Sequence, residues 1–232
     1  MAEHLNRREA IAGAGLVAAG AVLVACGADS TSGGSTTTGA AATTTAPESA
    51  GGGQCVLARE ATEGPFYLAD RSVVRADVTE GRAGAPLELS LEVQDATSCN
   101  PIENASVDIW HTDAAGAYSG VDGDTGRFMR GRQETGADGV ATFQTIVPGW
   151  YQGRAVHIHV KVHVDGNEVH TGQLYFDEAT QQAVFNGGDY AGRGMPDVAN
   201  SEDGIFDEQG LLELSKRANG YTATKRLGVT AT

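Results

Sequence analysis

Basic residues are scarce in this sequence. Its 16 lysines and arginines are outnumbered by 30 aspartates and glutamates, which gives a formal net charge of −14. No basic patch follows the first 25 residues, and this argues against nucleic acid as a partner. It also means that any association with a membrane must come from an anchor other than a basic surface.

Long apolar runs are also lacking. The apolar run over residues 10–25 is too short to span a bilayer comfortably, and it follows Arg7 and Arg8. This pattern is typical of a twin-arginine export signal. The run ends in the sequence LVAC, which resembles a lipoprotein signal-peptidase site and predicts Cys26 as a lipidated first residue. The alternative is an ordinary signal peptide that happens to end near a cysteine.

Apolar residues are nearly absent from the next segment, residues 26–53, which consists mostly of Gly, Ser, Thr and Ala. Such a segment cannot offset its ordering entropy and is expected to be a flexible tether. The sequence therefore predicts a signal peptide over residues 1–25, a tether over 26–53 and one folded domain over 54–232. The expected location is the outer face of the bacterial cytoplasmic membrane, held only by a lipid at Cys26, or the secreted fraction.

Cysteine is the next scarce residue, with only three copies. If Cys26 carries the lipid, Cys55 and Cys99 remain as an even pair in an oxidising compartment. We predict a disulfide between them, and the alternative is two free thiols.

No internal repeat and no glycine loop of the nucleotide-binding type is present, and strand patterns are frequent instead. Strands are expected over residues 86–95, 105–112, 139–147, 155–164, 168–176 and 221–229. Residues 113–139 are expected to form a long loop, and residues 177–185 and 208–218 short helices. These features predict an all-β fold, an antiparallel β-sandwich with long loops and one or two short helices.

The most informative stretch is residues 148–159, PGWYQGRAVHIH. Strand alternation places His157 and His159 on one face, about 7 Å apart, so that one metal ion could reach both imidazoles. A pair of this kind on an exposed strand is often surface decoration. His163 shares their face and is expected to be solvated, whereas His111 is expected to support a ligand or to pack rather than to bind the metal.

Two tyrosines strengthen the prediction of a metal site. Tyr151 precedes His157 by six residues, and Tyr118 lies near the start of the long loop. A structural zinc site prefers thiolates or imidazoles, and a non-haem Fe(II) oxygenase site prefers two histidines and a carboxylate. Phenolate is a hard anionic donor that ionises near pH 10, and a strongly Lewis-acidic cation such as Fe(III) is needed to hold two of them at neutral pH.

Four segments of the chain resemble the intradiol ring-cleavage dioxygenases, the family of protocatechuate 3,4-dioxygenase and catechol 1,2-dioxygenase. These segments are TEGPFY (residues 62–67), VDIWHTDAAGAYSG (107–120), FQTIVPGWYQGRAVHIHVKV (143–162) and TGQLYF (171–176). The resemblance covers most of residues 55–177. Its order of Tyr, Tyr, Arg, His-x-His and Gln is specific.

The resemblance implies one non-haem Fe(III) per chain and a reaction with O2 that cleaves a catechol between its hydroxyl-bearing carbons to a muconate-type diacid. The implied metal ligands are Tyr118, Tyr151, His157 and His159. Arg154 matches the arginine that stabilises negative charge on the bound ring, and Tyr151 is implied to act in catalysis as well. The residues implied to line the substrate pocket are Gln173, Thr62, Gly64 and Pro65. A homo-oligomer is possible for such an enzyme.

A second function class stays open at this point. The chain could be a non-catalytic extracytoplasmic lipoprotein, a β-sandwich binding module with a decayed metal site. The presence of both tyrosines, both histidines and Arg154 favours the enzyme, because the loss of any one of them would suffice to destroy the site.

Overall fold

The computed structural model describes residues 55–69 and 73–230. The predicted signal peptide, the predicted tether and Cys26 lie outside the described residues, and they remain predictions together with the domain boundary at residue 54. Within the described ranges, none of the helices is both long and apolar enough to cross a bilayer.

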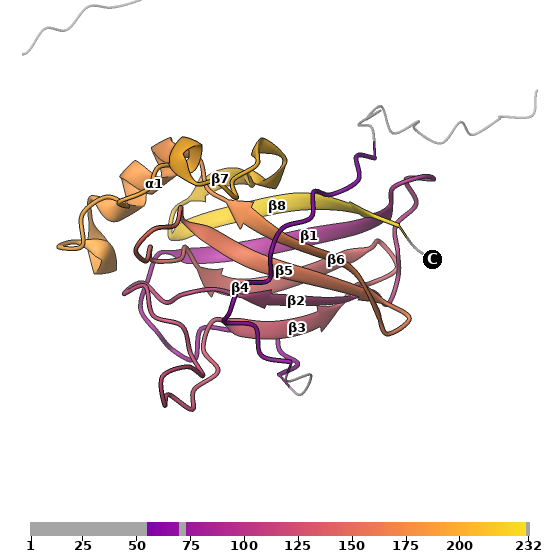
Figure 1. Cartoon of the computed structure of the whole chain (residues 1–232), viewed down its shortest axis with the longest axis horizontal. Coiled ribbons are helices and arrows are strands. Elements are labelled where there is room, and N and C mark those ends of the chain that lie inside the picture. The colour runs from indigo at the N-terminus through magenta and orange to yellow at the C-terminus, as the bar shows by residue number, and fades with distance from the viewer. Residues whose placement is uncertain (1–54, 70–72, 231–232) are drawn as a thin grey trace, which may run out of the picture. The chain divides into compact units, whose positions relative to one another are not determined.

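The described chain is built mainly from strands. The strands are β1 (Pro86–Asp95), β2 (Ser106–Trp110), β3 (Arg130–Glu134), β4 (Val140–Ile146), β5 (His157–Val164), β6 (Asn167–Tyr175), β7 (Glu213–Arg217) and β8 (Gly220–Val229). The helices are α1 (Glu178–Phe185) and the short 3-10 turns η1 (Gly188–Tyr190), η2 (Asn200–Glu202) and η3 (Glu208–Gly210). Helix α1 lies at one end of the strands (Figure 1).

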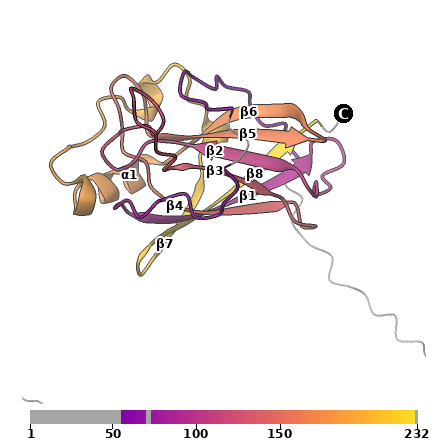
Figure 2. The same cartoon turned by 90° about the horizontal axis from the view of Figure 1, so that it is seen from below.

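Two four-stranded sheets form the sandwich, one in the order β4-β1-β8-β7 and the other in the order β3-β2-β5-β6. Figure 2 shows them as two layers, with β2, β3, β5 and β6 in one and β1, β4 and β8 in the other. The pairings are antiparallel except for β1 and β8, which run parallel. The predicted fold class is confirmed.

Aliphatic side chains from both sheets fill the space between them. Alternate residues of β1 point inward, and Leu89 and Leu91 are completely buried there. Ile158 and Val160 of β5 are completely buried as well. Burying one such side chain stabilises the fold by about 1.5–3 kcal/mol, so this layer fixes which face of β5 points away from the core.

The other face of β5 is buried too. We call residues 55–68 the N-terminal strap; the Ala61 amide of the strap donates to the Thr171 carbonyl of β6 at 2.8 Å. Further along, Glu63 forms an ion pair of 2.6 Å with Lys161 of β5. The prediction that His163 is solvated is wrong: only 6% of it is exposed, and the Asp108 carboxylate lies 3.8 Å from its ring.

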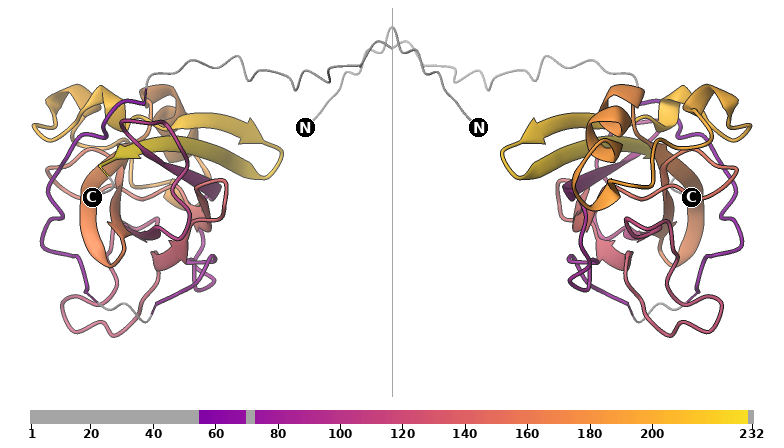
Figure 3. Two further views of the ribbon diagram at one scale, coloured as in Figure 1. Left: turned by 90° about the vertical axis from the view of Figure 1, so that its right-hand side faces the viewer. Right: turned by 90° about the vertical axis from the view of Figure 1, so that its left-hand side faces the viewer.

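Two predicted elements differ from the structure. The predicted loop over residues 113–139 contains β3, an edge strand whose sequence RGRQE has no apolar alternation and which forms by pairing with β2. The predicted helix over residues 208–218 is wrong: η3 and β7 occupy it. Ala218 and Asn219 form the two-residue turn of the hairpin after β7, and Gly220, at φ 116°, begins β8 as the partner of Arg217. This hairpin, drawn in yellow, extends beyond the neighbouring strands (Figure 3).

A disulfide joins Cys55, at the start of the N-terminal strap, to Cys99 in the turn after β1, with Cα atoms 5.3 Å apart. Its reduction should lower the free energy of unfolding by roughly 3–4 kcal/mol, because the bond links residues 44 positions apart in the sequence. Urea denaturation with and without dithiothreitol measures the change. The double variant Cys55→Ser, Cys99→Ser should have the denaturation midpoint of the reduced wild type, and dithiothreitol should not change it. A wild-type midpoint that does not change on reduction would contradict this expectation.

Candidate functional site

Two imidazoles of β5 form the centre of the site. The Nε2 atoms of His157 and His159 lie 3.1 Å apart. The strand register pairs His159 with Trp110 of β2 on one side and with Gln173 of β6 on the other. The Trp110 indole stacks on the His159 ring with centroids 4.8 Å apart and planes 5° from parallel, so packing fixes the orientation of this imidazole.

The hydrogen bonding of His157 fixes its tautomer. Its Nδ1 lies 2.7 Å from the Ala155 carbonyl oxygen, which can only accept, so we assign the proton to Nδ1. The lone pair of Nε2 therefore points into the cluster, as it must in a metal ligand. Burial, followed by the nearby Arg154 cation, lowers the pKa of His157 to about 4, so the imidazole is neutral at pH 7.

Two phenols converge on the same point. The Oη of Tyr151, in the loop after β4, lies 3.5 Å from Nε2 of His157. The ring of Tyr118 lies 5.6 Å from that of Tyr151 and 6.3 Å from that of His159, measured between centroids. Burial raises the pKa of both phenols, well above the usual value for Tyr118, and for Tyr151 the neighbouring Arg154 offsets it only in part.

The donor set fits a strongly Lewis-acidic cation. The Tyr118 hydroxyl is buried without a hydrogen-bond partner in the part of the chain that the structure describes. Buried polar atoms of this kind call for an explanation such as a bound ion. Over residues 55–69 and 73–230, no group of three or more His, Cys, Asp or Glu side chains could hold a metal, so the anionic donors here are the tyrosines. Neutral imidazoles and hard phenolates suit Fe(III).

Arg154 is held on three sides. Its Nε donates to the Asp203 carboxylate at 2.9 Å, its Nη2 donates to Oε1 of Gln173, and its Nη1 lies 3.5 Å from Oη of Tyr151. Gln173 also accepts from the Tyr175 hydroxyl at 2.9 Å. The structure thus brings the predicted Arg154 and Gln173 together beside the donors, and it adds Asp203 and Tyr175, which the sequence did not single out.

The N-terminal strap closes the site on the other side. Gln173 donates from Nε2 to the Thr62 carbonyl at 3.0 Å, and the Thr62 hydroxyl accepts from the Gly64 amide at 3.1 Å. Gly64 has φ 67°, and a Cβ there would lie 3.4 Å from Cε1 of His159. Pro65 is exposed, and the next ring, Phe66, stacks on Tyr118 with centroids 4.4 Å apart.

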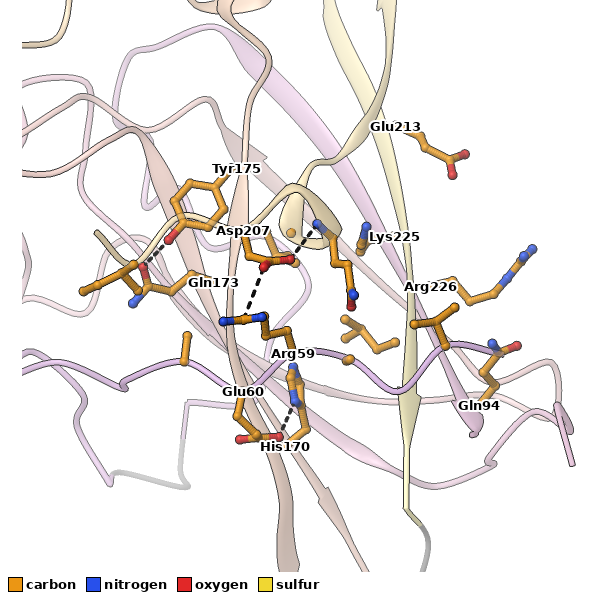
Figure 4. A pocket seen from close by; sticks show the side chains of 18 residues that line it. Arg59, Glu60, Gln94, His170, Gln173, Tyr175, Asp207, Glu213, Lys225 and Arg226 are labelled. Carbon is orange, nitrogen blue, oxygen red and sulfur yellow. Dashed lines mark hydrogen bonds and ion pairs between the residues drawn. The ribbon is translucent and has the colours of Figure 1, made fainter. Parts of the chain in front are cut away.

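Two cavities adjoin these residues. One of about 450 Å³ opens in front of Tyr118 and Tyr151, with Phe66 in its wall. The other, of about 370 Å³, lies between the strap, β6 and β8, and Gln173 and Tyr175 line it (Figure 4). Two of the four donors, Tyr118 and Tyr151, line the first cavity, and none lines the second, so the first is the candidate substrate cavity. Of the residues predicted to line the substrate pocket, Gln173 lines the second cavity, and Thr62, Gly64 and Pro65 line neither.

His111 does not join the donors. It is completely buried, and its Nδ1 and Nε2 lie 2.7 Å from the Thr112 carbonyl oxygen and from Oγ1 of Thr145, respectively. Both ring nitrogens are thereby engaged, and the geometry agrees with a packing role for this residue.

Comparisons with known proteins show similarity to dioxygenases. A dioxygenase family model matches residues 62–185, more than half of the 232 residues. An intradiol ring-cleavage dioxygenase from Tetranychus urticae has a similar structure, with 32% identity, a TM-score of 0.73, and coverage of 76% of this chain and 95% of that one. The dioxygenase domain of a dioxygenase and carbohydrate-binding fusion from Streptomyces sp. SirexAA-E has 34% identity, a TM-score of 0.62, and coverage of 76% and 100%.

Curated relatives match a shorter part of this chain. A chlorocatechol 1,2-dioxygenase from Cupriavidus pinatubonensis is 30% identical over 138 residues, which are 50% of this chain and 54% of that protein. The chain therefore spans about half the length of the curated relatives it matches.

His111 should make the stability of the metal-free protein depend on pH. Burial, only partly offset by the hydrogen bond to Thr112, lowers the pKa of His111 to about 4, below its ordinary value of 6.5. The stability that follows from keeping this ring neutral is full above pH 6.5, and up to roughly 3 kcal/mol is lost as the pH falls to 4. His111→Gln keeps a donor and an acceptor without titrating, so its free energy of unfolding should fall less over this range. Urea titrations at several pH values measure both proteins, and equal slopes would refute the assignment.

Proposed function

The chain belongs to the intradiol ring-cleavage dioxygenase family, and from this premise we propose that it cleaves catechols between the two hydroxyl-bearing carbons with O2, giving muconate-type diacids. The observation that carries the proposal is the convergence of two phenols and two neutral imidazoles in one buried cluster. One non-haem Fe(III) per chain would be held there by Tyr118, Tyr151, His157 and His159.

The bound ferric ion would supply Lewis-acid chemistry, drawing electron density from a catechol so that its ring can react with O2. His157 and His159 are ready to bind a cation, since both are neutral at pH 7 and neither has to lose a proton. Trp110 and the Ala155 carbonyl hold the two rings in place. Fixed ligands of this kind need little rearrangement when they bind.

Arg154 and Tyr151 would act on the substrate directly. A catechol that loses both hydroxyl protons carries two negative charges, and the fixed Arg154 guanidinium supplies positive charge beside the position of the ring. The Oη of Tyr151 lies 3.5 Å from that guanidinium. As the ionised phenolate of the metal-loaded protein, Tyr151 would take one of the catechol protons. Gln173 and Asp203 prevent the guanidinium from turning away.

The substrate cavity has room for more than an unsubstituted ring. Its volume of about 450 Å³ falls in the range of pockets that bind drug-sized ligands. Chlorocatechols are named for curated relatives of this chain. Ring-substituted catechols are therefore the substrates that we propose.

We also propose that the enzyme works outside the cytoplasm. The pairing of Cys55 with Cys99 supports this location, because disulfides persist in oxidising compartments. The twin-arginine pattern and the cysteine at position 26 support export and lipid anchoring. Fractionation of cells that produce the Cys26→Ser variant, compared with wild type, tests whether the membrane contact depends on a lipid.

Iron-loaded wild type should be red to burgundy, because two phenolates on Fe(III) absorb visible light, and the colour should shift when catechol is added without oxygen. Tyr118→Phe should lose much of this absorption, whereas Tyr67→Phe, which removes a hydroxyl bonded to Asp108 outside the donor set, should keep it. Oxygen uptake with catechol, protocatechuate, hydroxyquinol and caffeate identifies the substrate. A colourless protein that contains iron, or semialdehyde products, would overturn the proposal in favour of a binding module or another reaction.

Arg154→Gln should lower kcat by roughly 10²–10³-fold, the usual cost of removing one preorganised group that stabilises developing charge. Arg226→Gln is the control, since Arg226 is paired with Glu92 on the exposed surface and should change kcat little. Steady-state oxygen uptake measures both variants. An Arg154→Gln variant with the wild-type kcat would refute the proposed role of Arg154 in the reaction.

A further inference from the structure

Asp203 is a buried carboxylate in the part of the chain that follows the family match. It comes directly after η2, beyond the match that ends at residue 185. Only 2% of its side chain is exposed. A carboxylate this deeply buried is expected to be paired, and its partners indicate what it does.

Both oxygens of Asp203 accept hydrogen bonds. Oδ2 accepts from Nε of Arg154 and from the Ala155 amide, each at 2.9 Å. Oδ1 accepts from the Ile205 amide at 2.9 Å, which holds the carboxylate against its own loop. A single oxygen atom therefore bridges the guanidinium and the peptide that leads into β5.

The hydrogen bond from the Ala155 amide connects Asp203 to the donor cluster through one residue. Asp203 holds the amide of Ala155, and the carbonyl of Ala155 holds Nδ1 of His157 at 2.7 Å. That carbonyl sets the tautomer of His157 and the direction in which its Nε2 points. The same carboxylate thus fixes a cation beside the substrate and supports an imidazole of the donor cluster.

The electrostatics of Asp203 agree with this geometry. Burial acts to raise its pKa, but the amides of Ile205 and Ala155 and the Arg154 cation outweigh burial and keep the pKa below its ordinary value. The carboxylate is consequently ionised at neutral pH and can hold Arg154 as an ion pair.

We infer that Asp203 is a positioning residue, which orients the Arg154 guanidinium towards the substrate and, through the backbone of Ala155, orients His157 towards the metal. The inference rests on the proposed function, because it assigns a purpose to a contact with the proposed site. Groups that orient metal ligands typically contribute 10- to 100-fold to metal affinity or activity. Without Asp203 the Arg154 guanidinium would keep its hydrogen bond to Gln173 but lose the hydrogen bond that its Nε donates.

The test compares Asp203→Asn and Asp203→Ala with the control Asp108→Asn. Counted over the whole residue, Asp108 and Asp203 are both 8% exposed. Asp108 is also paired with an arginine, Arg132, and its partners in the described part of the chain do not include Arg154 or Ala155. Both Asp203 variants should lower kcat and iron affinity by roughly 10- to 100-fold and shift the visible absorption band of the iron-loaded protein. The control should keep the wild-type band and kcat, even if its denaturation midpoint falls.

Crystal structures of the metal-free proteins add a readout that needs no activity. In Asp203→Ala, the Arg154 guanidinium and the His157 ring should change orientation, whereas in Asp108→Asn both should stay in place. An Asp203→Ala variant with unchanged Arg154 and His157, unchanged band and unchanged kcat would overturn the inference. If wild type neither binds iron nor consumes oxygen, the proposed function fails, and the orientations of Arg154 and His157 in the variants still decide whether Asp203 positions them.

Discussion

The register between β5 and its two neighbours determines the site. Trp110, His159 and Gln173 are direct partners across three adjacent strands, and His157 is the partner of Tyr175 in the same way. A shift of one residue would turn each imidazole into the aliphatic core, since side chains alternate between the faces of a sheet. The completely buried aliphatic residues of β5 prevent such a shift, so the packing of the core also fixes the placement of the two imidazoles.

This constraint costs free energy of folding, because the polar face of β5, a central strand of its sheet, becomes buried. Charged groups are costly to bury unless they are paired, and the N-terminal strap supplies pairs. Glu63 of the strap binds Lys161, of which 4% is exposed, and Glu60 lies 2.7 Å from Nδ1 of His170. Where the strap passes the donors its residues change to Gly64 and Phe66, which cover the rings of His159 and Tyr118 without adding charge.

Strand alternation in the sequence was enough to predict β1, β4, β5 and β6 and to place two imidazoles on one face. It failed for β7, because this short, mostly polar segment forms a strand only by pairing with β8. It gave no sign of Asp203, whose partner Arg154 lies 49 residues away and whose own segment has no regular pattern. Tyr175 could have been found, since it shares the parity of Gln173 on β6.

The charges of the buried side chains explain why the fold tolerates this site without a metal and why the site would still attract a cation. Without a metal the four donors are neutral, since burial keeps the imidazoles unprotonated and the phenols protonated, and Arg154 is balanced by Asp203. The buried cluster thus imposes no uncompensated charge on the fold. Ionisation of a phenol there needs nearby positive charge, and Arg154 and Arg130, the latter 5.9 Å from the Tyr118 ring centroid, provide part of it. The two arginines alone leave the pKa of Tyr118 raised. A bound cation would have to supply the remaining positive charge, so occupancy of the proposed metal site would be linked to the ionisation of its tyrosines.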